Sequence, residues 1–182
     1  MSGIAGVLKL DGCPPNIELL GRMISALEHR GCDGARRWQE GAVALGHCAL
    51  NSTLESFDEL QPLEDPSGGA VVAFDGRLDN RGELISLLCS KVHFNPTKTD
   101  AELVLKSYLC WGEDCPRRIL GDFAFAIWDK RKQQLFCARD PIGVKPFYYC
   151  FDGNKFLFCS EIQPLFKDAT VHVEPNIPLI AR

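Results

Sequence analysis

The sequence predicts an α+β domain built in layers, with sheets that are mostly antiparallel. Segments typical of strands concentrate towards the two ends of the chain, and segments with helical spacing lie between them. This segregation favours an α+β architecture over a doubly wound parallel sheet, in which strands and helices alternate. A chain of 182 residues also suits one domain, since that length buries about 70% of its unfolded surface without disulfide or metal support.

The N-terminal third is expected to hold two strands and one helix. Residues 2–10 form an apolar segment typical of a buried strand, and residues 41–50 form a second one with many small side chains. Between them, Asn16 can cap a helix whose apolar residues recur every three or four positions. A loop over 29–34 follows that helix. The polar, turn-rich region 51–69 is expected to be a long loop.

The middle of the chain predicts one strand and two helices. Residues 71–74 are apolar and typical of a strand, and the turn signal Asp75-Gly76 predicts that this strand breaks there. Asn80 is expected to cap the first helix. Thr99 begins the second helix, with Glu102 at the third helical position, which is the spacing of a capping box.

The C-terminal third is rich in strands. Residues 123–129 are expected to pair with 134–138, and residues 146–151 with 155–160 across a turn of Asp, Gly and Asn. A short helix over 161–166 follows them. These antiparallel pairs supply the remaining strands of the predicted sheets.

Composition and charge narrow the function classes. The net charge of −4 provides no attraction to nucleic acid or to an anionic membrane. The apolar runs fall far short of the roughly 20 residues of a membrane span, and no basic region precedes the first apolar segment, as it would in a signal peptide. We therefore expect a cytoplasmic protein.

The nine cysteines are irregularly spaced and odd in number, which indicates reduced thiols that fill apolar space. None forms a C-x-x-C pair. The closest two, Cys110 and Cys115, have no second pair or histidine cluster to complete a zinc set. We expect no metal site.

The N-terminus carries a candidate nucleophile. The small Ser2 permits removal of Met1, and it would then hold a hydroxyl and a free α-amine in one residue. Since such an amine titrates at about 7.7–8.0, it can act as a base near neutral pH, which is a known route to acyl transfer. The same residues also fit an ordinary chain that begins Met-Ser and enters a strand.

Eight separate motifs occur in chain order. They are Gly3-Ile4-Ala5-Gly6, His29-Arg30-Gly31-x-Asp33-Gly34, Leu45-Gly46-His47, Gln61-Pro62-Leu63, Asp75-Gly76, Thr99-Asp100-Ala101-Glu102, the segment from Leu120 to Trp128, and the segment from Ala138 to Tyr149. Together they resemble the glutaminase domain of asparagine synthetase-type class II glutamine amidotransferases, over nearly the whole chain.

The resemblance implies an N-terminal-nucleophile hydrolase fold, a four-layer αββα sandwich, over residues 1–168. It also implies a partner, a synthetase domain or separate synthetase subunit, that adenylates a carboxylate with ATP and magnesium and lies outside this sequence. Residues 169–182, which include two prolines, are expected to begin the linker to that domain. No cofactor is expected in this chain itself.

The resemblance also places the glutaminase site. The family nucleophile is a cysteine, and its position here is Ser2, whose hydroxyl is much harder to deprotonate than a thiol of pKa about 8.5. The arginine that grips the substrate carboxylate is replaced by Ala49. The asparagine that donates to the oxyanion is replaced by Asp75, which as a carboxylate accepts and cannot donate, although the following Gly76 is kept.

The substrate's amino group is held in the family by two acidic residues. One position is Arg77, which repels an ammonium, and the other survives as Asp100. Because these changes agree in direction, glutamine hydrolysis is expected to be absent. Arg30 and the Arg139-Asp140 block are interpreted as structural residues that brace loops and strand ends.

Several functions stay open. One is a degenerate glutaminase-like domain of an ATP-dependent amide-forming enzyme. Among relatives of this kind, β-lactam synthetases and lasso peptide cyclases, the cyclases fit best, because they look like Met-Ser-Gly-Ile-Ala-Gly at their start. Such a cyclase joins a peptide's terminal amine to an Asp or Glu side chain. The alternatives are a serine N-terminal-nucleophile amidohydrolase, a glutamine-hydrolysing asparagine synthetase with an altered site, and a free-standing interaction protein.

Overall fold

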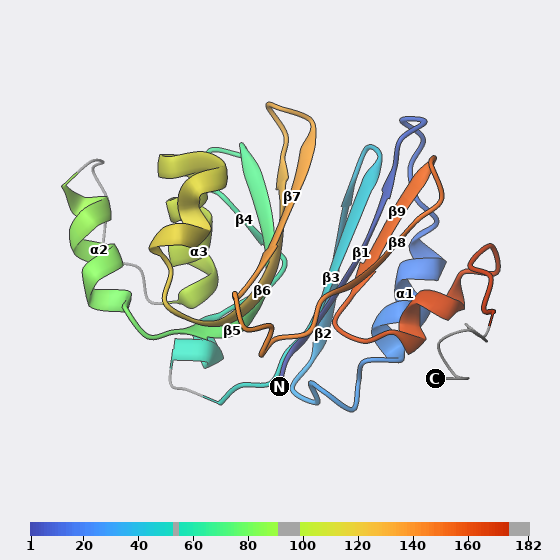
Figure 1. Ribbon diagram of the computed structural model, residues 1–182, viewed down its shortest axis with the longest axis horizontal. Coiled ribbons are helices and arrows are strands. Elements are labelled where there is room, and N and C mark those ends of the chain that lie inside the picture. Colours follow the sequence, from blue (N-terminus) through green and yellow to red (C-terminus); the bar gives the residue numbers. More distant parts are fainter. Residues whose placement is uncertain (53–54, 91–98, 175–182) are drawn as a thin grey trace, which may run out of the picture.

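Two antiparallel sheets lie face to face between helices in the computed structural model, which describes residues 1–52, 55–90 and 99–174 (Figure 1). Every strand pairing among these residues is antiparallel. The predicted α+β class and the αββα order of layers are both confirmed. No helix in the described part of the chain has the length and apolar content to cross a bilayer.

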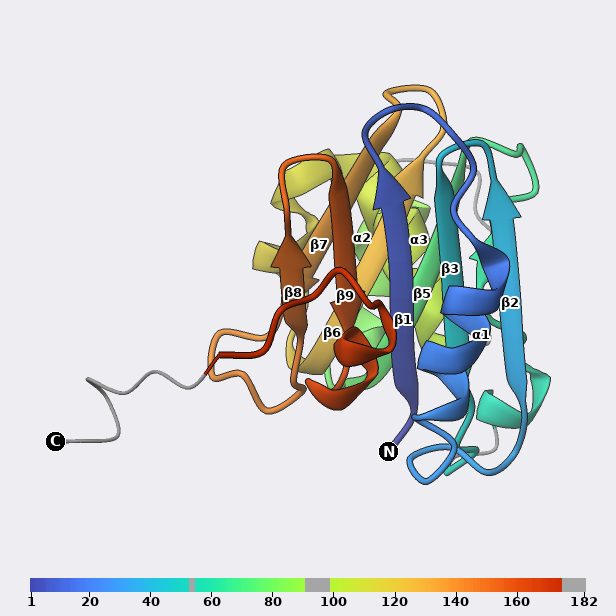
Figure 2. The ribbon, with the colours of Figure 1, turned by 90° about the vertical axis from the view of Figure 1, so that its right-hand side faces the viewer.

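The first sheet, sheet A, has five strands, and the N-terminal strand lies at its centre (Figure 2). In spatial order they are β2 (Ala35–Glu40), β3 (Val43–Cys48), β1 (Gly3–Lys9), β9 (Lys155–Cys159) and β8 (Tyr148–Phe151). Helix α1 (Ile17–Ser25) covers its outer face, and the Asn16 side chain caps that helix by accepting from the Glu18 amide at 2.8 Å. The 3₁₀ helix η3 (Gln163–Lys167) contacts α1 and takes the place of the helix predicted over 161–166.

The second sheet, sheet B, has four strands and two covering helices. In spatial order the strands are β4 (Leu63–Glu64), β5 (Ala70–Leu78), β6 (Gly121–Asp129) and β7 (Gln134–Arg139). Helices α2 (Arg81–Cys89) and α3 (Asp100–Trp111) lie on its outer side (Figure 1), and the 3₁₀ helix η2 (Gly112–Arg118) follows α3. The predicted cap of α3 is confirmed, since Thr99 Oγ1 accepts from the Glu102 amide at 3.3 Å.

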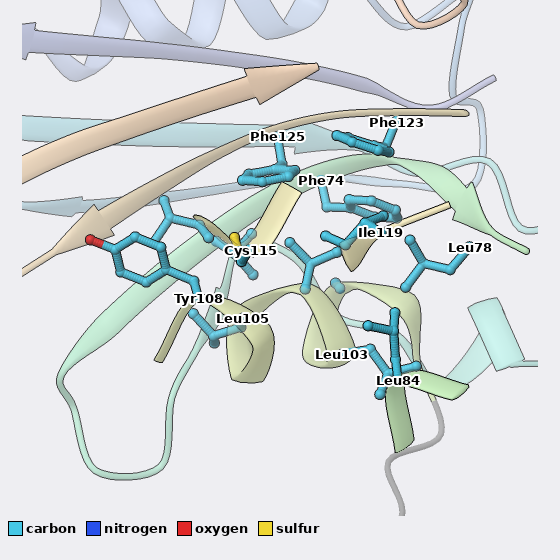
Figure 3. Packing of buried hydrophobic residues seen from close by; sticks show 14 of the residues in the cluster. Phe74, Leu78, Leu84, Leu103, Leu105, Tyr108, Cys115, Ile119, Phe123 and Phe125 are labelled. Atoms are coloured by element: carbon cyan, nitrogen blue, oxygen red, sulfur yellow. The ribbon is translucent and has the colours of Figure 1, made fainter. Parts of the chain in front are cut away.

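Three layers of buried side chains hold the sandwich together. The inner layer lies between the sheets and comprises Ile4, Val43, Leu45, Val71, Ala73, Ala124, Ala126, Trp128 and Phe158. One outer layer joins sheet A to α1, and the other joins sheet B to α2 and α3 (Figure 3). Each fully buried large apolar side chain contributes about 1.5–3 kcal/mol, so the inner layer fixes how the two sheets face each other.

Two differences from the sequence-based prediction concern the first half of the chain. Strand β2 was not predicted, because its residues are polar and mostly exposed; it forms at the edge of sheet A by pairing with β3. The region predicted as a long loop over 51–69 contains the 3₁₀ helix η1 (Glu55–Asp58) and the two-residue strand β4.

The predicted strand break at Asp75-Gly76 is wrong. Strand β5 continues to Leu78, with Asp75 opposite Ala124 and Gly76 opposite Phe123 on β6. Gly76 allows the β6 backbone to approach β5 closely, because a Cβ at this position would lie 2.5 Å from the Asp122 carbonyl oxygen.

Asn80 occupies the N-cap position of α2, as predicted. Its side chain makes no capping hydrogen bond to α2. Instead its Oδ1 accepts from the Leu120 amide at 3.0 Å and its Nδ2 donates to the Arg118 carbonyl at 2.9 Å, which ties the start of α2 to the segment before β6.

The predicted domain boundary stays a prediction. The last element, η3, ends at Lys167, and the part of the predicted linker at 175–182 lies outside the described residues. The cysteines predicted to fill apolar space include Cys48, Cys115 and Cys159, which are buried, while Cys13, Cys32 and Cys89 are exposed.

Candidate functional site

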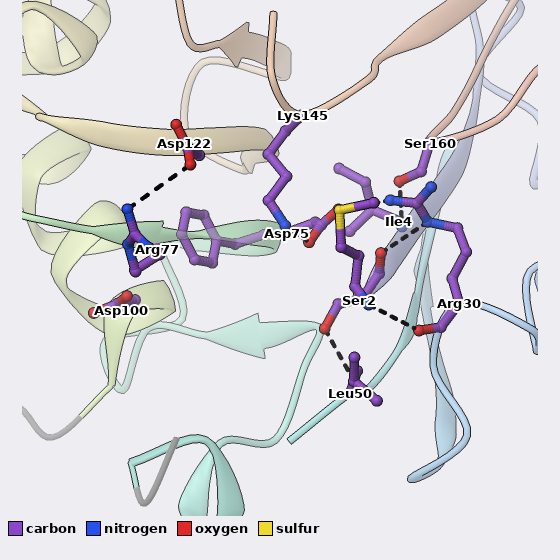
Figure 4. Close-up of polar contacts among 12 residues, drawn as sticks. Ser2, Ile4, Arg30, Leu50, Asp75, Arg77, Asp100, Asp122, Lys145 and Ser160 are labelled. Atoms are coloured by element: carbon purple, nitrogen blue, oxygen red, sulfur yellow. Dashed lines mark hydrogen bonds and ion pairs between the residues drawn. The ribbon is translucent and has the colours of Figure 1, made fainter. Parts of the chain in front are cut away.

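One cavity collects every position that the resemblance singled out. It has a volume of about 380 Å³ and lies where the start of the chain, the end of β3 and the second half of β5 meet. Its lining includes Ser2, Ala49, Asp75, Gly76, Arg77 and Asp100. Residues up to 98 positions apart in the sequence therefore share one site, and Figure 4 shows several of them.

Ser2 lies immediately before β1 and is held by its backbone. Its carbonyl accepts from Arg30 Nε at 3.0 Å, and the Met1 ammonium donates to the Arg30 carbonyl at 3.3 Å. The Ser2 hydroxyl oxygen accepts from the Leu50 amide at 3.1 Å (Figure 4). The hydroxyl thus lines the cavity from a fixed position on the chain.

Asp75 is the most deeply buried charged residue of the site, with a side chain only 1% exposed. Its Oδ1 accepts from Lys145 Nζ at 2.9 Å, and its Oδ2 pairs with Arg30 Nη2 at 3.3 Å. Arg30 also pairs with Glu161 through Nη1 at 3.1 Å. Two cations therefore compensate this carboxylate, which explains how strand β5 runs through a buried aspartate.

The loop between β7 and β8 presents Lys145 to Asp75. Asp140 shapes this loop, because its carboxylate accepts from the Val144 and Lys145 amides at 2.9 and 3.0 Å. Burial by itself would raise the pKa of Asp140, but these backbone hydrogen bonds hold that pKa below its ordinary value. Asp140 braces the loop, in agreement with its interpretation as a structural residue.

The two positions expected to bind a substrate ammonium, Arg77 and Asp100, carry opposite charges. Arg77 is 63% exposed and pairs with Asp79 at 2.8 Å and with Asp122 at 3.8 Å. Asp100 remains acidic, but its Oδ2 accepts from the Leu78 amide at 2.9 Å and its Oδ1 is paired with Arg81. The surviving carboxylate is thus committed to a cation of the chain itself.

His47 is a site residue that sequence reasoning did not select. It lines the cavity from β3, is 5% exposed, and its Nε2 has no hydrogen-bond partner among the described residues. Burial lowers the pKa of His47 to about 4, against a hydrogen bond to the Phe74 carbonyl that raises it. The ring is therefore neutral at pH 7. Its place in the Leu45-Gly46-His47 motif was the available signal.

Comparison with known proteins assigns the family. Residues 1–181 match the family model of the glutamine amidotransferase domain. The chain belongs to this family. It is 37% identical over 150 residues to glutamine-hydrolyzing asparagine synthetase 3 of Bacillus subtilis, a match that covers 81% of this chain and 24% of that protein. It is 34% identical over 192 residues to putative glutamine-hydrolyzing asparagine synthetase 2 of Methanocaldococcus jannaschii, a match that covers 97% of this chain and 37% of that protein.

A third relative and two solved structures extend the comparison. Amidase chry2 of Gibberella zeae is 33% identical over 149 residues, covering 81% of this chain and 22% of that protein. The structure of glutamine phosphoribosylpyrophosphate amidotransferase from Bacillus subtilis matches with a TM-score of 0.73 at 19% identity, covering 90% of this chain and 43% of that one. An allosteric regulatory enzyme of purine biosynthesis matches with a TM-score of 0.74 at 19% identity, covering 91% and 43%. These structures establish the amidotransferase fold of N-terminal-nucleophile hydrolase type.

The matched relatives are much longer than this chain, which spans 24% and 37% of the two synthetases. The activities in their names belong to those longer proteins. Within the described residues, no group of three or more His, Cys, Asp or Glu side chains could hold a metal ion.

Proposed function

We propose that this amidotransferase-family domain does not hydrolyse glutamine. The observation that carries the proposal is the Asp75 carboxylate, held by Arg30 and Lys145 at the position where the resemblance implies an oxyanion donor. A carboxylate has no N–H to donate, and its charge opposes a developing oxyanion. Loss of one such donor costs about 2.7–4 kcal/mol of transition-state stabilisation.

Substrate recognition is weakened at the same cavity. Ala49 provides no guanidinium for the substrate carboxylate, and a hydrogen bond to a charged group contributes about 1.5–3 kcal/mol. Arg77 brings a positive charge towards a substrate ammonium, and Arg81 neutralises Asp100. These effects concern different atoms of glutamine and all disfavour its binding.

We further propose that the parent protein is an ATP-dependent amide-forming enzyme, most specifically a lasso peptide cyclase. In such an enzyme the amine comes from the peptide substrate, so a domain that releases no ammonia is compatible with the reaction. The kinship with two proteins named as asparagine synthetases supports a synthetase partner. That partner would bind ATP and Mg²⁺ and close a macrolactam between the peptide's terminal amine and an Asp or Glu side chain.

A second function is favoured by two observations. Ser2 lines the cavity, and one relative is named an amidase. If Met1 is removed, Ser2 could act as the nucleophile of an amidohydrolase on an amide other than glutamine. The altered oxyanion position at Asp75 argues against this function, as it does against a working glutaminase.

The test is glutamate release from glutamine by the purified chain, whose intact mass shows whether Met1 is present. The native chain is compared with the quadruple variant Ser2→Cys, Ala49→Arg, Asp75→Asn, Arg77→Glu, and the Bacillus subtilis relative is the positive control. We expect no release from the native chain and measurable release from the variant.

Two outcomes contradict the proposal. Glutamate release by the native chain, abolished by Ser2→Ala, would make Ser2 a working nucleophile on glutamine. Hydrolysis of other amides by the native chain, with the same dependence on Ser2, would support the amidohydrolase instead.

A further inference from the structure

A second pocket lies on the side of the sandwich where both sheets end. Strand β7 is the last strand of sheet B and β8 is the last strand of sheet A, and Figure 2 shows them on the same side of the molecule. The pocket between them has a volume of about 500 Å³ and is called the edge pocket. It is lined by Cys137, Ala138, Arg139, Phe147, Tyr149 and Phe156. Among the described residues, none lines both the edge pocket and the cavity that contains Ser2.

Three aromatic side chains give the edge pocket an apolar lining. Tyr149 on β8 lies opposite Phe158 on β9, and residues opposite one another point to the same face of a sheet. Tyr149 therefore points to the inner side, where Phe158 is buried, but it is 66% exposed because sheet B ends at β7 in the described part of the chain. The Tyr149 ring stacks on Phe156 with centroids 5.6 Å apart, and Phe147 stacks on Phe158 at 5.1 Å. These stacked rings favour an aromatic ligand.

Arg139 is the only charged residue among the described residues that line the edge pocket. Its guanidinium forms no ion pair with a carboxylate in the described part of the chain. The adjacent carboxylate, Asp140, instead accepts from the Val144 and Lys145 amides. A guanidinium presents five N–H donors in a planar fork that matches a carboxylate. The unpaired cation beside the aromatic rings therefore favours a ligand with a negative charge.

We propose that the edge pocket binds a small aromatic carboxylate. The aromatic body packs against the Tyr149 and Phe147 rings and removes apolar surface from water, and the carboxylate accepts from Arg139. The volume of about 500 Å³ is within the usual range of small-ligand sites. The inference goes beyond the proposed function and does not depend on it, since the two cavities share no residue among those described.

The test is a nuclear magnetic resonance titration of the native chain with indole-3-acetate, and with indole-3-acetamide as the uncharged control. The backbone amide shifts of Cys137 and Tyr149 are the readout. We expect saturable shifts with the carboxylate and about fivefold weaker binding of the amide, the upper range for an ion pair that solvent reaches. Arg139→Gln should bind the two compounds equally. Arg117→Gln, which removes an exposed arginine outside the pocket, should keep the native preference.

A second pair of variants tests the aromatic lining. Tyr149→Ser should weaken the binding of both compounds by about fivefold, because it removes a stacking ring. Phe151→Ser is the matched control, since Phe151 lies on the same strand, is 56% exposed and does not line the pocket. Equal binding of carboxylate and amide by the native chain, no saturable shift with either, or equal weakening by the two serine variants overturns the inference. Glutamate release tests the proposed function separately, so each can fail without the other.

Discussion

At the scale of single residues, the compensation of Asp75 determines the stability of the site. Its partners Arg30 and Lys145 have side chains only 8% and 12% exposed. Asp75→Ala leaves both cations buried without it, and we expect a loss of about 3–5 kcal/mol in the free energy of unfolding, measured with urea. The control is Asp79→Ala, which removes an exposed partner of Arg77 and should cost at most about 1 kcal/mol. Equal losses in the two variants would show that the buried network contributes nothing.

His47 predicts a pH dependence of stability. Its pKa is lowered by burial to about 4 in the folded chain and is about 6.5 when unfolded. The unfolded state therefore binds more protons between these values, so stability falls as pH falls from about 6.5 to 4, with a loss of about 2 kcal/mol by pH 5. Urea unfolding gives the difference in the free energy of unfolding between pH 7 and pH 5 for each chain. Relative to the native chain, this difference should be smaller by about 2 kcal/mol in His47→Gln and unchanged in His29→Gln. An unchanged difference in His47→Gln would contradict it.

The candidate site could be predicted from sequence only in part. The resemblance identified six positions that the fold brings into one cavity, because each position lies in a recognised motif or within two residues of one. The ion pairs of Asp75 could not be predicted, since Arg30 and Lys145 lie 45 and 70 positions away and only the fold brings them together. His47 belonged to a recognised motif, but an unsatisfied ring nitrogen is a property of its surroundings, which the sequence does not show.

At the scale of elements, prediction from sequence succeeded where local signals decide the structure and failed where strand pairing decides it. Asn16 and Thr99 cap their helices as predicted, because capping is local. Strand β2 escaped prediction because pairing with β3 overrides its polar, exposed sequence. Strand β5 runs through Asp75-Gly76 because nine residues pair with β6, which outweighs a two-residue turn signal.

Alanine substitutions at two glycines test the packing of β5 and of α2. A Cβ at Gly76 would lie 2.5 Å from the Asp122 carbonyl oxygen and 2.9 Å from Phe123 Cα, so Gly76→Ala should destabilise the chain by about 1–3 kcal/mol through overpacking. A Cβ at Gly82, in α2, meets nothing within 4 Å, so Gly82→Ala should stabilise it by up to about 1 kcal/mol. Thermal unfolding of both variants shows whether each substitution lowers or raises the stability of the chain. A tolerated Gly76→Ala would mean that β5 and β6 do not approach this closely.

At the scale of the whole molecule, the inner layer between the sheets predicts that both sheets unfold together. Trp128 on β6 belongs to that layer, and Trp38 on β2 packs against it from sheet A. Trp111, the third tryptophan, ends α3 on the outer side of sheet B. Three variants that each keep one tryptophan, with the other two replaced by phenylalanine, report on these places by fluorescence. We expect coincident urea transitions for all three, since loss of either sheet would expose the apolar inner layer that both sheets share. If the Trp38 and Trp128 reporters unfold at different urea concentrations, the two halves are separate units. The cavity that spans them, from Ser2 before β1 to Asp75 on β5, is then lost when the first half unfolds.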